Sequence, residues 1–150
     1  HAVIMAGHHV GAAAAYGRTR TTPGQPDYST ANAGLSYDFQ VVKLMGQVNT
    51  QSFAARRQKT YLIGAIAPIG VSQVMISYAR ADASGGGTDA NDGSQFSVGY
   101  SYALSKRSNV YATATRVTNK GAAAFGIFGA GGSSVGGSSQ GVEVGMRHSF

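Results

Sequence analysis

The sequence contains no cysteine and no tryptophan, and only three of its 150 residues are prolines. Without cysteine the chain has neither a disulfide framework nor a cysteine-ligated metal site. Charged residues make up only 12 % of the chain, about half the usual share of a soluble domain. The first residues show no basic region followed by an apolar core, so we expect no signal peptide in them.

Long apolar runs are missing as well. The most apolar stretch, YLIGAIAPIGV, is interrupted by Pro68 and by two glycines. No run approaches the roughly 18 apolar residues of a membrane-spanning helix. The sequence therefore argues against a helical membrane protein. It does not argue against a membrane barrel, because the apolar and polar residues of a spanning strand alternate and give only a weak average hydrophobicity.

Basic residues are in excess but scattered. The net charge is +6, and ARRQK at 55–59 is the only tight basic group. A nucleic-acid partner would require clustered basic residues among stacking aromatics, or a recognition motif. We therefore expect no nucleic-acid partner.

Alternation of apolar and polar residues is what the sequence has in abundance, and this period of two is typical of strands with one apolar face. QFSVGYSYAL, NAGLSYDF, VKLMGQVNTQ and SQVMISYA all show it. The pattern predicts about eight strands, at 8–20, 30–39, 42–53, 59–67, 71–81, 95–104, 109–118 and 141–150. The faces of 59–67 and 109–118 are ambiguous.

The predicted connections alternate in length. The longer ones are 21–29, 54–58, 82–94 and 119–140, and the tight turns lie near 40–41, 68–70 and 105–108. The glycine-rich stretches at 82–94 and 121–141 read as mobile surface loops. Because every second connection is short, all short turns lie at one end of an up-and-down sheet, as in outer-membrane barrels.

The polar face decides between a soluble barrel and a membrane barrel. It consists mostly of Gly, Ser, Gln, Asn and Ala rather than of the Lys and Glu expected of a water-exposed strand. Tyrosines also gather near predicted strand ends, where an aromatic girdle would lie; they are Tyr16, Tyr37, Tyr61, Tyr78, Tyr102 and Tyr111. We therefore predict an all-β, transmembrane, antiparallel up-and-down β-barrel.

Motifs for other chemistry are weak. His8 and His9 are adjacent, so in a strand they point to opposite faces and cannot chelate one metal together. DANDG at 89–93 lacks the spacing and the closing glutamate of an EF-hand, which favours a polar turn over a calcium loop. No G-x-S-x-G elbow is present, and the candidate carboxylates lie in predicted loops, at Asp27, Asp82, Asp89 and Asp92. We therefore expect no enzyme, no cofactor and no metal site.

The carboxyl-terminal GVEVGMRHSF ends on an aromatic residue with apolar residues at alternate positions before it. This tail resembles the closing strand of Gram-negative outer-membrane proteins. MRHSF, together with LSYDFQVVKLMGQ, YALSKRSNVYATATRVTNKG and the glycine-rich last loop, is similar to the general diffusion porins of β-proteobacteria. The similarity runs from about His9 to Phe150, whereas HAVIMAGHH matches no part of the family.

The resemblance implies a sixteen-stranded barrel that forms homotrimers in the outer membrane. Residues 1–150 would then be one porin-type segment, the C-terminal half of the barrel, and the constriction loop of the family would lie outside it. The implied partners are outer-membrane lipid and lipopolysaccharide, the barrel-assembly machinery, and small ions and solutes. The implied assembly signal comprises Val142, Val144, Met146, His148 and Phe150.

The implied function is passive diffusion of small hydrophilic solutes and ions through a water-filled channel. The predicted pore-lining residues are Lys43, Gln47, Asn49, Gln51, Arg116, Glu143 and Arg147. Arg116 is included because an arginine facing mid-membrane costs a few kcal/mol. Placing Arg116 inward turns Tyr111, Thr113 and Val117 outward. Glu143 and Arg147 could instead pair with one another. An excess of positive wall charge predicts a weak anion preference.

Two alternatives differ in class. A complete eight-stranded barrel would have a structural or adhesive role, but it encloses only enough room for side chains, and its interior should hold bulky or paired charged residues. The predicted inward positions are instead rich in small residues. An outer-membrane hydrolase would need a nucleophile, a histidine and a carboxylate within reach, and no such set emerges.

Overall fold

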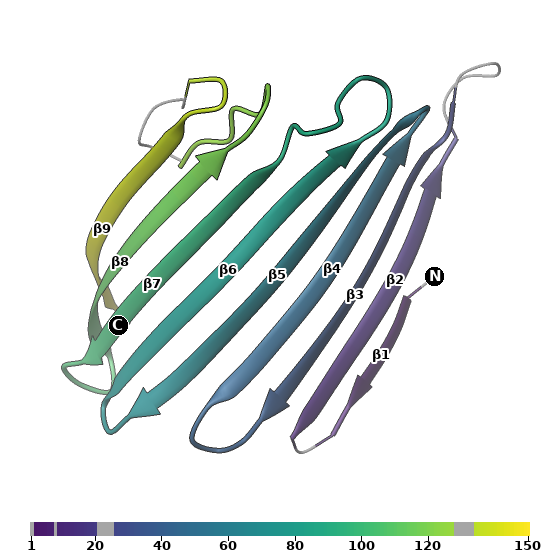
Figure 1. Cartoon of the computed structure of the whole chain (residues 1–150). Helices are drawn as coiled ribbons and strands as arrows, with labels where there is room; N and C mark the ends of the chain where they lie inside the picture. Colours follow the sequence, from purple (N-terminus) through teal and green to yellow (C-terminus); the bar gives the residue numbers. More distant parts are fainter. Residues whose placement is uncertain (1, 8, 21–25, 128–133) are drawn as a thin grey trace.

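The structure, a computed structural model, describes residues 2–7, 9–20, 26–127 and 134–150. In this part of the chain nine strands form one antiparallel sheet in sequence order (Figure 1). They are β1 (Ala2–Ala6), β2 (Val10–Thr19), β3 (Tyr28–Asp38), β4 (Lys43–Phe53), β5 (Arg56–Ile69), β6 (Ser72–Ser84), β7 (Gly93–Ala103), β8 (Ser108–Asn119) and β9 (Ser138–His148).

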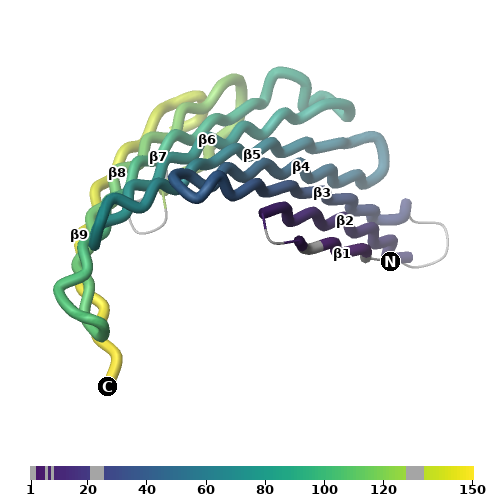
Figure 2. Tube along the Cα trace, turned by 90° about the horizontal axis from the view of Figure 1, so that it is seen from below, coloured from purple at the N-terminus to yellow at the C-terminus, as the bar shows by residue number. Residues whose placement is uncertain are grey.

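The sheet is an open, curved trough, which Figure 2 shows from below. Each described strand pairs only with its neighbours in the sequence, so β1 and β9 form the two edges. This open order contradicts the alternative of a closed eight-stranded barrel within the chain. The predicted all-β, antiparallel up-and-down fold is confirmed.

The two faces of the trough differ in exposure. On β3 and β8, residues such as Gly34 and Thr113 are half-buried, whereas Leu35 and Ala112 beside them are exposed. Curvature crowds side chains on the inside and spreads them on the outside. The face of Gly34 and Thr113 is therefore the concave face, and the face of Leu35 and Ala112 is the convex face.

The convex face carries a continuous apolar band. Register places Val142, Ala114, Val98, Ile76 and Ala65 in one row across five strands, because directly paired residues share a face. Val144 and Val142 are 75 % and 78 % exposed. An exposed apolar surface of this extent is far larger than water-soluble monomers tolerate.

The strands agree with the prediction except at three places. β1 is an additional strand paired with β2, and His8, the first residue of the predicted strand 8–20, lies outside the described residues. The predicted longer loop 54–58 is wrong, because β4 and β5 are joined by the two-residue turn Ala54–Ala55. Ala54 adopts a positive φ of 54°, which a tight hairpin turn needs and which sequence pattern alone does not indicate for alanine.

The third difference concerns strand β8. Tyr111, Thr113 and Val117 were predicted to face outward, but they pair with Gly145, Glu143 and Ser139 on the concave face. Tyr111 therefore lies apart from the other predicted girdle residues, among which Tyr61 and Tyr78 lie on the convex face.

Candidate functional site: the concave wall

Six of the seven predicted pore-lining residues lie on the concave face. In the register of β4 with β3, Gln51, Asn49, Gln47 and Lys43 stand opposite Thr30, Asn32, Gly34 and Asp38. In the register of β9 with β8, Glu143 and Arg147 stand opposite Thr113 and Asn109. Most of the concave face is thus a wall of amides, hydroxyls and small residues with few charges, interrupted on β5 by Leu62 and Ile66.

Arg116 is the exception, and its predicted position on the pore wall is wrong. It pairs with Phe96 and Gln140, which places it on the convex face. It lies three residues before the end of β8, at the end of the sheet that carries the long loops. The cost of an outward arginine falls to about 0–1 kcal/mol near a membrane interface, so this depth makes the position tolerable.

Glu143 is held by a tyrosine rather than by Arg147. The Tyr111 hydroxyl donates a hydrogen bond to Glu143 Oε1 at 2.9 Å. A Cβ on Gly145 would lie 2.5 Å from the Tyr111 ring. The ring therefore lies over Gly145, where any side chain would collide with it. Among the described residues, none of the ion pairs includes Glu143 or Arg147.

Glycines in the middle of the wall also leave room for neighbouring side chains to lie flat. The Met45 side chain lies over Gly64, with its Cε 3.7 Å from the position a Cβ would take, and the Met75 side chain lies over Gly99 at 3.1 Å. The two methionines therefore lie flat against the wall instead of projecting into the trough.

Charge is divided unequally between the faces and along the strands. On the strands, the concave face carries Lys43, Arg56 and Arg147 against Asp38 and Glu143. The convex face carries Arg18, Arg57, Lys59, Arg80 and Arg116 against Asp82, all toward the end with the long loops. This ring of basic residues borders the apolar band.

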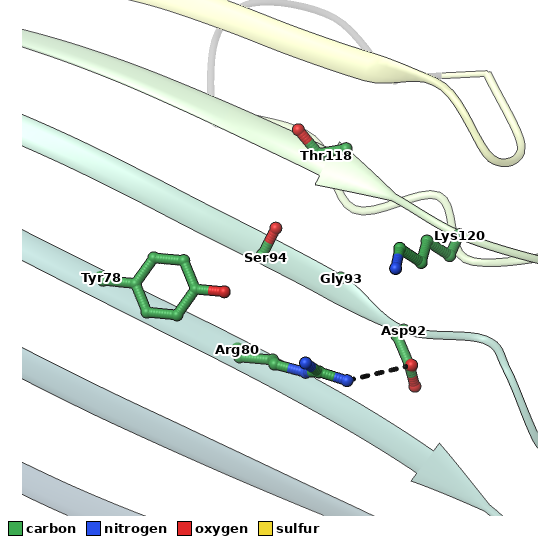
Figure 3. A pocket seen from close by; sticks show the side chains of 7 residues that line it. All are labelled: Tyr78, Arg80, Asp92, Gly93, Ser94, Thr118 and Lys120. Carbon is green, nitrogen blue, oxygen red and sulfur yellow. Dashed lines mark ion pairs between the residues drawn. The ribbon is translucent and has the colours of Figure 1, made fainter.

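A small hollow of about 90 Å³ lies within this ring between β6 and the start of the loop after β8. In Figure 3 the Tyr78 hydroxyl and the Lys120 ammonium group approach it from opposite sides. Arg80 forms ion pairs with Asp82 at 2.6 Å and with Asp92 at 3.5 Å. Its charge is therefore locally balanced, unlike that of Arg56 on the opposite face.

The long loops lean over the concave face at the same end. A Cβ on Gly85 would collide with the Ala55 carbonyl oxygen, and one on Gly86 would lie 2.7 Å from Arg56 Cγ. The loop backbone after β6 thus rests on the turn between β4 and β5. The described residues of this predicted mobile loop are in close contact with the wall.

The loop after β8 is fixed by Asn119, which is 3 % exposed. Its side-chain amide donates to the Phe125 and Gly137 carbonyl oxygens at 2.9 and 3.0 Å, and its Oδ1 accepts from the Phe125 amide at 2.9 Å. Asn91 Oδ1 accepts from the Ala122 amide at 2.7 Å and connects the two loops. Residues 21–25 and 128–133 of the predicted loops lie outside the described residues.

Beneath these loops lies a hollow of about 330 Å³, here called the mouth hollow. Its principal lining residues are Tyr28, Phe53, Arg56, Arg57, Gln58 and Phe125. The predicted loop at 54–58 leaves Arg56 outside the predicted pore wall. A two-residue turn at 54–55 would have continued the alternation of β4 into β5 and placed Arg56 on the polar face.

Features of other kinds of site are lacking in the described residues. No group of three or more His, Cys, Asp or Glu that could hold a metal ion occurs there. The same residues include no helix that is both long and apolar enough to cross a membrane.

A curved antiparallel sheet that is apolar outside and polar inside, with long loops at one end, is the wall of a membrane β-barrel. Comparison with known families is consistent with this class. Residues 3–122 match the Gram-negative porin family, and the chain belongs to that family, whose members lie in the outer membrane.

Two relatives show how the chain relates to longer porins. It is 34 % identical over 134 residues to outer membrane porin protein 32 of Delftia acidovorans, covering 83 % of this chain and 37 % of the relative. It superimposes on the anion-selective porin from Comamonas acidovorans with a TM-score of 0.88 and 30 % identity, covering 99 % of this chain and 48 % of that porin. The chain thus spans less than half the length of both.

Proposed function

We propose that this chain forms about half of the wall of an outer-membrane channel for small hydrophilic solutes and ions. The observation that carries the proposal is the two-faced sheet, in which Ile76 and Val98 share the apolar convex row while Asn49 and Gln47 share the polar concave one. A polar wall replaces part of a solute's hydration, and the apolar band dissolves in lipid. The channel needs neither a cofactor nor covalent chemistry.

The other half of the wall comes from additional strands, since an open sheet edge is not tolerated in hydrocarbon. We assign residues 1–150 to the C-terminal half of a sixteen-stranded barrel that assembles as a homotrimer. Lipopolysaccharide around the basic ring and the barrel-assembly machinery acting on Val142, Val144, Met146, His148 and Phe150 are the partners that this assignment implies.

A weak preference for anions is part of the proposal. It is supported by the small excess of basic over acidic residues on the concave strands and by the similarity to the anion-selective porin from Comamonas acidovorans. The charges act over about 8 Å at physiological salt. One unit charge at that distance in water contributes about 0.5 kcal/mol before screening, about twofold in local anion concentration.

Planar bilayers containing the full-length protein test this function. We expect stepwise conductance in KCl and a reversal potential in a KCl gradient that favours chloride. Arg147→Gln should lower the chloride-to-potassium permeability ratio by up to about twofold, since it removes one wall charge. Arg116→Gln, on the convex face, is the matched control and should leave the ratio unchanged.

The absence of conductance from correctly folded protein would contradict the channel function. Equal effects of the two substitutions would contradict the assignment of the concave face as the conducting wall.

A further inference from the structure

The mouth hollow combines aromatic rings with arginines in an ordered arrangement. Tyr28 pairs with Phe53, and Phe53 pairs with Arg56, so these three residues form one row across β3, β4 and β5 on the concave face. Gln51 and Gln58 form the next row toward the middle of the sheet. A flat apolar surface, a cation and amide donors therefore lie within two adjacent rows.

The charge of the hollow is unbalanced. Arg56 and Arg57 both line it, and no acidic residue is among its described lining residues. Asp89, in the loop above, instead accepts a hydrogen bond from the Gly85 amide. The ion pairs of the described residues involve Arg18 and Arg80 rather than these two arginines. A guanidinium without a carboxylate partner is a receptor for an anion.

A phenylalanine held in place by the loop after β8 also lines the hollow. Asn119 holds the Phe125 backbone on both its amide and its carbonyl side. A side chain at Gly93 would collide with the Phe125 ring, so the ring rests on bare backbone. Phe125, in the loop after β8, is therefore held against β7 and lines the same hollow as Phe53.

From this arrangement we infer that the mouth hollow is a binding site for small organic anions that have a flat apolar body, such as aromatic monocarboxylates. The carboxylate accepts two parallel hydrogen bonds from Arg56, a geometry that guanidinium groups match. The ring of the ligand lies against Phe53, Tyr28 and Phe125, which favour offset or edge-on contacts. The volume of about 330 Å³ lies at the lower end of the range for small-molecule sites.

The site rests on the proposed channel function, since it would raise the concentration of such anions at the loop-side mouth. It adds a specificity that wall charge alone does not provide. Long-range charge attracts chloride, acetate and benzoate alike, whereas the aromatic row distinguishes benzoate from acetate.

Current measurements with the full-length channel test the inference, with benzoate as the probe and acetate as the ringless control. We expect benzoate added on the loop side to reduce the chloride current reversibly, at concentrations at which acetate does not. Arg56→Gln should weaken this block about tenfold, as expected for loss of a charge-assisted hydrogen bond. Phe125→Ala should weaken it about two- to tenfold, through loss of an aromatic contact.

Arg80→Gln is the matched control, because Arg80 lies at the same end of the sheet but on the convex face and is paired with Asp82. It should leave the benzoate block unchanged. Equal block by acetate and benzoate would overturn the site, as would an unchanged block in the Arg56→Gln channel.

Calorimetric titration of the detergent-folded protein with benzoate separates this inference from the channel function. Binding that is weakened by Arg56→Gln supports the site even if no current is seen, in which case only the channel function fails. No benzoate binding by folded wild-type protein would overturn the site, even if the channel conducts.

Discussion

At the scale of single residues, the face and the depth of a position determine what a side chain costs. Ile76 lies in the middle of the apolar band, between Val98 and Ala65. Ser77, the next residue, pairs with Gly64 and Ser97 on the concave face. Two neighbouring residues therefore meet different solvents.

Ile76→Arg should lower the free energy of unfolding by about 2–4 kcal/mol, since it places a charge at the bilayer midplane. Ser77→Arg should cost much less, because its side chain meets the water-filled side. Denaturant unfolding of the full-length protein in lipid vesicles measures both. Similar losses from the two substitutions would contradict the assignment of the faces.

Arg116 shows why residue positions were only partly predictable from the sequence. The alternation in 109–118 fits either face, and the prediction of an inward Arg116 rests on the cost of an arginine at mid-membrane. That cost depends on depth, and depth is fixed by the register with β7 and β9. Lys43, Gln47, Asn49 and Gln51 lie on one strand with unambiguous alternation, so their common face could be read directly.

At the scale of strands and loops, local pattern predicted the regular elements better than their connections. Strands with one apolar face repeat every second residue, which the sequence displays. A tight turn that depends on a positive φ at Ala54 has no such signature. Likewise, a glycine-rich composition predicted mobile loops, whereas the fixing contacts come from single side chains, Asn119 and Asn91.

Asn119→Ala should release the loop after β8 without unfolding the sheet. The substitution removes the side-chain partners of part-buried backbone groups of Phe125 and Gly137, and each lost hydrogen bond contributes about 1 kcal/mol. We expect faster hydrogen exchange and protease cleavage within residues 120–127, with strand protection unchanged.

Asn109→Ala on the same strand is the control, because Asn109 Oδ1 is buried without a hydrogen-bond partner. It should leave exchange in 120–127 as it is. If Asn119→Ala has no effect on exchange there, then Asn119 is not what holds the loop.

At the scale of the whole molecule, the open trough implies further strands and, under the proposed function, three channels per assembly. Single-channel records of the full-length protein should show openings in groups of three, and its mass in detergent should be three times that of one chain. Dilution or heating that separates the subunits should give single steps. A stable monomer with independent single openings would contradict the trimer.

The strictly sequential order of the sheet has a consequence for how such walls diversify. Because each described strand pairs only with the strands before and after it, a β-hairpin can be gained or lost as a unit without disturbing the pairing of the remaining ones. The diameter of a barrel grows roughly linearly with its number of strands. Duplication of one hairpin would therefore widen the pore by a fixed amount, and deletion of one would narrow it. A change in the length of the gene would in this way change the size of the solutes that the pore admits.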